Sequence, residues 1–302
     1  MATAAQDQYT KLASGLYLEG LAVDHASGVI WYSDVVAGGV HGVTPDGRPV
    51  RTLNADRKWT GGILINHDGK VLSSGQHGIM WNDPGGEASG WLIDTIDGAP
   101  INGINEMVPD GEGGIVFGTI AMDAVIAGRA PGPVAIYRLT RDREVILLAD
   151  GIGFTNGLMF DAERRRLYCN ETFHATLAFD VAEDWTLSNR RVVLDKEDCD
   201  GMALDADGNL WVTGFASKFL ERLAPDGTLL ERVPTPGPVT QVRFGGPDLR
   251  DFYIAKVSST GGQTLKEGGQ ITERRSHIYS GRSLVPGRAV QPAGFDLPDH
   301  KA

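Results

Sequence analysis

Short apolar runs, separated by turn residues, cover most of the chain. Glycine, proline, aspartate and asparagine punctuate these runs, and no long stretch has the periodicity of an amphipathic helix. Residues 198–211 are typical of the pattern. The segment 205–208 reads Asp-Ala-Asp-Gly, which predicts a tight turn, and Leu210 and Trp211 then begin a new strand. The pattern predicts an all-β protein.

The pattern repeats along the chain. Six segments align, and they begin at Glu19, Gly61, Asn105, Asn156, Asp200 and Thr240. Their starting points lie 40 to 51 residues apart, the period of a propeller blade, and a second apolar run follows each of them. We therefore predict a single domain, residues 1–302, folded as a six-bladed β-propeller. Residues 9–13 are predicted to supply the outer strand of the last blade and so close the ring.

The six starting residues are predicted to meet. In a propeller the first strand of each blade lines the central channel, so the residue just before it lies at one mouth of that channel. Two carboxylates, two amides, a hydroxyl and a glycine would then share a small volume. Crowded carboxylates need a proton or a cation between them. Because every candidate ligand is an oxygen, the sequence predicts a hard divalent cation at this mouth.

Composition narrows the class of protein. The chain has 302 residues, 41% hydrophobic and 22% charged, as in an ordinary globular protein. A formal charge of -11 argues against a nucleic-acid partner. The two cysteines, Cys169 and Cys199, are too few for a disulfide framework, and strand alternation points Cys199 away from Asp200. With no signal peptide and no run long enough to span a membrane, we expect a cytoplasmic protein without a membrane partner. The oligomeric state is not predicted.

At the repeat residues the sequence resembles the gluconolactonase/regucalcin (senescence marker protein) family of six-bladed propellers. The resemblance covers nearly the whole chain. Its metal-ligand motifs match E-G at Glu19, T-N-G-L at 155–158 and D-G-M-A-L-D-A-D-G-N-L-W from Asp200. The resemblance implies that Glu19, Asn156 and Asp200 hold one divalent metal ion, with Ca, Mg, Mn, Zn and Fe all open. It also implies that Asp200 is the general base and that Asn105 binds the substrate.

The chain departs from this family near Asn105. The family usually reads Arg-Pro-Asn-Asp where residues 103–106 read Gly-Ile-Asn-Glu, so an arginine that holds sugar oxygens is absent. An acidic substrate contact further along is also lost, in the region of Met122. Gly103, Ile104 and Met122 predict a roomier, more apolar pocket. The substrate is therefore expected to be less polar than a sugar lactone.

Other residues are weaker candidates. Trp59 is predicted to form a pocket wall. Glu106 is predicted either to contact the substrate or to position another residue of the site. Glu171 is a candidate support for the metal ligands, whereas a histidine such as His77 or His174 is more often structural. The glycine-rich segment 258–270 is either a lid or a flexible connection.

The sequence favours a metal-dependent hydrolase that opens a lactone, a small-molecule substrate. The metal would polarise the ring carbonyl and activate a water, Asp200 would take the proton of that water, and Asn105 would orient the substrate. Two alternatives stay open. One is a propeller that binds a metal or small ligand without turnover. The other is a metal-dependent isomerase or carbon–carbon bond enzyme that acts on a non-sugar substrate.

Overall fold

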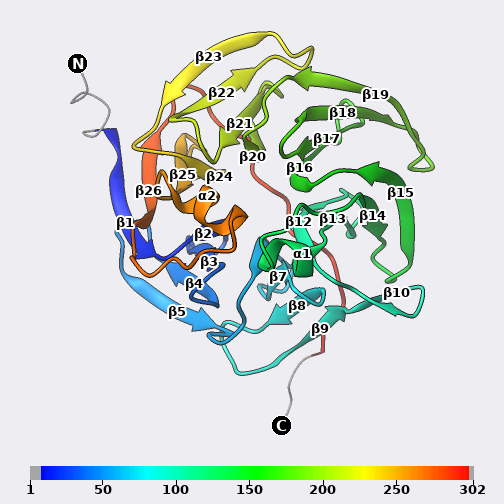
Figure 1. Cartoon of the computed structure of the whole chain (residues 1–302), viewed down its shortest axis with the longest axis horizontal. Coiled ribbons are helices and arrows are strands. Elements are labelled where there is room, and N and C mark those ends of the chain that lie inside the picture. Colours follow the sequence, from blue (N-terminus) through cyan, green and yellow to red (C-terminus); the bar gives the residue numbers. More distant parts are fainter. Residues whose placement is uncertain (1–7, 299–302) are drawn as a thin grey trace.

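The computed structural model describes residues 8–298, which form a ring of β-sheets (Figure 1). The strands nearest the axis are β2 (Leu18–Val23), β6 (Thr60–Ile65), β12 (Ile104–Pro109), β16 (Thr155–Asp161), β20 (Cys199–Leu204) and β24 (Val239–Gly245). The second strands are β3 (Ile30–Asp34), β7 (Val71–Gly75), β13 (Ile115–Thr119), β17 (Arg166–Glu171), β21 (Leu210–Gly214) and β25 (Asp251–Lys256). The outer strands are β4 (Val40–Val43), β5 (Pro49–Leu53), β8 (Ile79–Asn82), β9 (Ser89–Ile93), β14 (Val134–Leu139), β15 (Val145–Ile152), β18 (Ala175–Val181), β19 (Leu187–Leu194), β22 (Phe219–Leu223), β23 (Leu229–Pro234), β26 (Ser276–Arg282) and β1 (Thr10–Gly15). A small hairpin, β10 (Thr95–Ile96) and β11 (Ala99–Pro100), lies outside these sheets.

The sheets are arranged as blades around one axis. Four of them are separate and four-stranded: β2–β5, β6–β9, β12–β15 and β16–β19. The remaining eight strands form one sheet, in which β20–β23 join β24–β26 and β1 through the single pair Gly214–Val239. Each innermost strand contacts the next along the chain, and β24 contacts β2. The ring therefore closes, and the prediction of an all-β propeller is confirmed.

The N-terminal strand completes the last sheet. β1 pairs antiparallel with β26, with Thr10 opposite Ser280 and Gly15 opposite Ser276. The two ends of the propeller are thus held together by backbone hydrogen bonds between segments far apart in the sequence. This confirms the predicted closure by the first strand.

Each innermost strand has an irregular register at its repeat residue. In β2, for example, Leu18 pairs with Asp34 but the next regular pair is Leu21 with Tyr32, so Glu19 lies in the bulged stretch. The same shift surrounds Asn156 in β16 and Asp200 in β20. A bulge re-aims a side chain that regular pleating would send elsewhere. The repeat residues were predicted to lie just before these strands; they lie within them.

A glycine follows several repeat residues because neighbouring strands crowd the axis. A Cβ atom on Gly20 would collide with the carbonyl oxygen of Gly61, and one on Gly157 with the carbonyl oxygen of Asp200. Only glycine allows this close approach. In the Glu-Gly, Asn-Gly and Asp-Gly pairs of the repeat, the first residue thus points its side chain into the mouth of the channel. The glycine that follows allows the backbones of neighbouring strands to approach closely.

The two ends of the ring are covered differently. At one end, residues 283–298 cross the turns between first and second strands, where Asn66 exchanges hydrogen bonds of 2.9 and 3.0 Å with the backbone of Phe295. Over the other end lie two short helices, α1 (Met122–Ile126) and α2 (Gly261–Lys266) (Figure 1). The segment 258–270 therefore contains a helix. Among the described residues, neither helix is long or apolar enough to cross a bilayer.

Candidate active site

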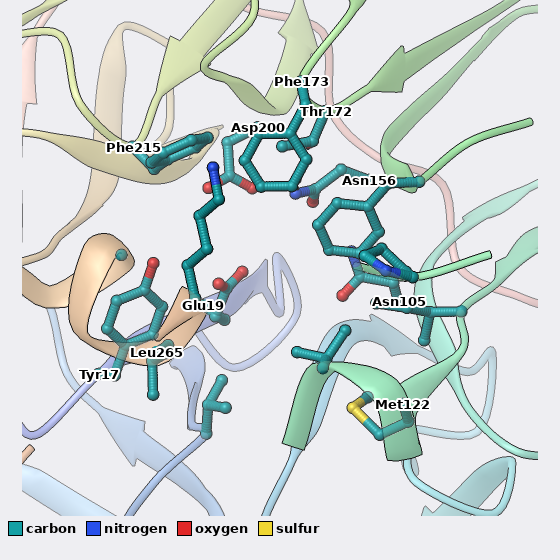
Figure 2. A pocket seen from close by; sticks show the side chains of 18 of the residues that line it. Tyr17, Glu19, Asn105, Met122, Asn156, Thr172, Phe173, Asp200, Phe215 and Leu265 are labelled. Carbon is teal, nitrogen blue, oxygen red and sulfur yellow. Dashed lines mark hydrogen bonds between the residues drawn. The ribbon is translucent and has the colours of Figure 1, made fainter. Parts of the chain in front are cut away.

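A cavity of about 580 Å³ opens at the end of the ring that carries the helices (Figure 2). This volume is within the range of small-molecule sites. The polar side chains of its floor belong to Glu19, Asn105, Asn156, Thr172 and Asp200. Figure 2 shows these side chains converging on one space from different strands. The sequence predicted this convergence for all of them except Thr172.

One of the six repeat residues does not take part. Gly61 lines the cavity with the four polar repeat residues, but Thr240 does not. The Thr240 hydroxyl donates to the carbonyl oxygens of Leu18, at 2.7 Å, and Ala255, at 3.1 Å. Thr240 therefore forms a hydrogen bond between the last blade and the first. The prediction that its hydroxyl points into the mouth is wrong.

The two carboxylates of the floor, the half-buried Glu19 and the buried Asp200, lie close to other negative charges. Burial, and then the charge of Glu106, raises the pKa of Glu19 to about 8. Burial raises the pKa of Asp200 well above its usual range, and the charges of Glu19 and Glu106 add to this effect. Asp200 is 2% exposed, and its Oδ1 atom is buried without a hydrogen-bond partner. Such a pair is unfavourable unless a proton or a cation lies between the two groups.

The amides of the floor are oriented by their neighbours. The Thr172 hydroxyl donates to the carbonyl oxygen of Cys199 at 2.7 Å and accepts from Nδ2 of Asn156 at 3.1 Å. Nδ2 of Asn105 donates to the carbonyl oxygen of Thr155 at 3.0 Å. Both amide nitrogens are therefore engaged, which leaves the amide oxygens for the cavity. Thr172 was missed by sequence reasoning, although its place directly after a second strand was a usable signal.

These groups fit a divalent metal ion. An unpartnered carboxylate oxygen, a second, half-buried carboxylate and oriented amide oxygens form an all-oxygen set, which suits a hard cation. Residues 8–298 contain no group of three or more histidine, cysteine, aspartate or glutamate side chains placed to hold a metal. The amide of Asn156 would thus have to complete the ligand set that Glu19 and Asp200 begin.

Two predicted substrate contacts do not reach the cavity. Ile104 is fully buried in the apolar core between two blades. Glu106 lies in the channel, where its carboxylate accepts from Nε2 of Gln241 at 2.5 Å and from the backbone of Met107 at 3.0 Å. It also pairs with the buried guanidinium of Arg243 at 3.5 Å. Bulged register between Ile104 and Met107 explains why sequence alternation did not reveal these orientations.

The space left by the absent arginine is filled. A Cβ atom on Gly103 would lie 2.8 Å from Cβ of Met122 and 3.0 Å from Cγ2 of Ile120. Met122 and Ile120 line the cavity, as does Trp59, whereas Gly103 does not. At this point the pocket is more apolar than an arginine would make it, but it is not roomier.

The remaining candidates lie away from the floor. Glu171 accepts from the backbone of Gly153 at 2.7 Å and pairs with Arg190 at 3.1 Å, so it holds a loop rather than the metal ligands. His77 and His174 are exposed and do not line the cavity. Cys199 is buried and free, and burial raises the pKa of its thiol.

Comparisons with known proteins identify the family of this chain. A profile of the SMP-30/Gluconolactonase/LRE-like region matches residues 18–258. Pentonolactonase of Haloferax volcanii is 27% identical over 252 residues, which cover 80% of this chain and 82% of that protein. A 6-deoxy-6-sulfogluconolactonase of Pseudomonas putida is 27% identical over 234 residues, 75% of this chain and 78% of that protein. Both relatives are named as lactone hydrolases.

The fold is also found among solved structures. The calcium-binding protein regucalcin of Agrobacterium tumefaciens superposes with a TM-score of 0.76 and 18% identity, over 93% of this chain and 95% of that one. At this identity the likeness concerns the fold alone. Because the profile match covers most of the propeller, the chain belongs to the SMP-30/gluconolactonase/LRE-like family.

Proposed function

We propose that this protein is a metal-dependent hydrolase that opens a lactone. The observation that carries the proposal is the unpartnered Oδ1 atom of Asp200, which lies at the floor of a cavity near a second carboxylate, the half-buried Glu19. Family membership and the names of the two lactonase relatives support the reaction class. We also infer six blades, because a single residue pair joins the two halves of the eight-stranded sheet.

Each floor residue has a role in this proposal. Glu19, Asn156 and Asp200 would hold the divalent ion, and Thr172 would fix the amide of Asn156 through its 3.1 Å hydrogen bond. When bound, the ion would polarise the lactone carbonyl and lower the pKa of a water molecule. Asp200 would accept a proton from the attacking water, and Asn105 would orient the lactone ring through its amide oxygen.

We further propose that the substrate is less polar than a sugar lactone. The walls above the polar floor include Trp59, Ile120, Met122, Val125 and Leu265. Apolar surface on a ligand would gain about 25 cal/mol per Å² on burial against such walls. The polarity of the walls, rather than the floor, would then determine which lactones this protein prefers.

The proposal is tested with a panel of lactones assayed before and after chelation. We expect turnover that falls on chelation and returns when one of the candidate divalent ions is added back. An alkyl-substituted lactone should have a higher kcat/KM than gluconolactone. Turnover that chelation leaves unchanged would contradict the metal-dependent mechanism. A preference for gluconolactone would contradict the proposed polarity, and stoichiometric metal binding without any turnover would favour a binding propeller.

A further inference from the structure

Three phenylalanines form a cluster at the mouth of the cavity, above the polar floor. Phe154, Phe173 and Phe215 all line the cavity, and Figure 2 shows Phe215 and Phe173 on either side of Asp200. Phe154 and Phe173 are stacked, with ring centroids 5.8 Å apart and planes 19° apart. Phe173 and Phe215 meet edge to face at 5.9 Å and 74°. We call these three residues the phenylalanine cluster.

Phe173 is held in an unusual position for an aromatic residue. Its φ is +72°, in the left-handed region that side chains larger than glycine seldom adopt. A 2.7 Å hydrogen bond from its backbone to the carbonyl oxygen of Glu197 fixes this loop. Phe173 is 43% exposed, and among the exposed large apolar side chains of residues 8–298 it alone lines the cavity. A strained backbone that presents an apolar ring to an open cavity is typical of a ligand contact.

Helix α2 approaches the cluster without filling the space beside it. A Cβ atom on Gly262 would lie 3.0 Å from the ring of Phe215, so the glycine permits this approach. Nζ of Lys266 lies 4.7 Å from the centroid of Phe173. The cation helps to hold the ring at the mouth, because the face of an aromatic ring attracts positive charge. The rings are thus fixed by their surroundings while part of their surface stays exposed.

We propose that the phenylalanine cluster binds an aromatic group carried by the substrate, while the lactone ring lies against the polar floor. The inference rests on the proposed function and names the substrate class for that site. Apolar walls alone would accept alkyl and aryl groups equally. Rings fixed in stacked and edge-to-face arrangements favour a further ring, because aromatic pairs gain more than their buried area predicts.

The test compares γ-phenyl-γ-butyrolactone with γ-cyclohexyl-γ-butyrolactone, which has similar bulk but no aromatic ring. The unsubstituted γ-butyrolactone has no group that could contact the phenylalanine cluster, so its turnover measures the reaction at the polar floor. For the wild-type protein we expect kcat/KM for the phenyl compound to exceed that for the cyclohexyl compound by about two- to tenfold. Phe173→Leu and Phe215→Leu keep an apolar side chain and should remove this preference. The readout is the ratio of the two kcat/KM values within each variant, so a general loss of activity does not count as a loss of the preference.

Trp91→Leu is the matched control, because Trp91 is 40% exposed and does not line the cavity. This variant should keep the full phenyl preference. Turnover of γ-butyrolactone without a phenyl preference would overturn the inference and leave the proposed function standing. If no lactone is turned over, the proposed function fails. Calorimetric binding of the two substituted lactones then decides the inference, and equal affinities, or a preference that survives both leucine variants, would overturn it.

Discussion

Asp200 and Asp205 lie at opposite ends of β20. Both carboxylates are buried, but they differ in their hydrogen-bond partners and in the direction in which their pKa values are shifted. The carboxylate of Asp205 accepts from the backbone of Asn209 at 2.9 Å and from Nε of Arg222 at 2.8 Å. Burial alone would raise the pKa of Asp205, but the hydrogen bonds from Arg222 and Asn209 outweigh burial and lower it. Asp200 is equally buried, yet its Oδ1 atom has no partner and its pKa is raised well above the usual range.

The same contrast extends around the ring. At the end with the turns, Asp110 pairs with Arg138 at 2.8 Å and Asp161 with Arg288 at 2.9 Å. No carboxylate of the cavity floor has an arginine partner of this kind among the described residues. The paired acids stabilise the fold, whereas the two carboxylates of the cavity floor have no cationic partner within residues 8–298. These floor acids destabilise the fold unless a proton or a cation binds, which is typical of a functional site.

Asp200→Asn should produce the largest change. We expect kcat/KM for a lactone substrate to fall about 10²- to 10⁴-fold, since the variant loses the proposed base. The free energy of unfolding in chelator should be unchanged or higher, because the variant removes a buried charge that Glu19 opposes. Lactone kinetics and denaturant unfolding measure the two quantities. Full activity in this variant would remove Asp200 from the mechanism.

Asp205→Ala should show the opposite behaviour. It leaves the half-buried Arg222 without its 2.8 Å partner and removes the acceptor of the turn, so we expect a loss of about 3 kcal/mol of unfolding free energy. The kcat/KM of the folded fraction should stay at the wild-type value, because Asp205 lies at the far end of the strand. A stability loss as small as that of an exposed substitution would contradict the assignment of Asp205 as a stabilising acid.

The stability of the chelated protein should depend on pH. Since the pKa of Glu19 is raised from 4.5 to about 8 in the folded protein, the folded state binds more protons than the unfolded state between these values. Stability should therefore be greatest at or below pH 4.5 as far as this group is concerned, and fall as the pH rises toward 8. We expect a loss of about 2 kcal/mol, less than the full shift implies, because water enters the cavity.

Unfolding at several pH values, with chelator and with a bound divalent ion, measures this dependence. Glu19→Gln should flatten the curve in chelator. A divalent ion should flatten it as well, because its charge would neutralise the carboxylates in place of bound protons. A chelated wild-type protein that gains stability across the same pH range would show that the floor carboxylates are not a repelling pair.

Thr172→Val should have the smallest of these effects. The variant keeps the shape of the side chain but loses the hydroxyl that accepts from Asn156, so the amide is no longer fixed. We expect metal affinity to fall about 10- to 100-fold, as for other residues that orient a ligand. Thr172→Ser keeps the hydroxyl and serves as the control. Titration calorimetry with the divalent ion compares the two, and equal affinities would separate Thr172 from the site.

The sequence by itself determined the repeat, the all-β ring, its closure by the first strand and the convergence of Glu19, Asn105, Asn156 and Asp200. These features depend on local periodicity and turn chemistry, which each segment carries within its own residues. A fixed repeat also places equivalent residues at equivalent points around an axis. These four floor residues were therefore predictable without any knowledge of the contacts between blades, whereas Thr172 was not.

Only the tertiary structure decided in which direction individual side chains point from the strands of the propeller. Bulges in the innermost strands sent Ile104 into the core and Glu106 to Arg243, and Thr240 turned to the backbone of the first blade. The phenylalanine cluster also joins residues from separate loops, and the floor needs Thr172 to fix Asn156. Such orientations depend on partners far away in the sequence, and a one-residue bulge reverses the direction that strand alternation predicts.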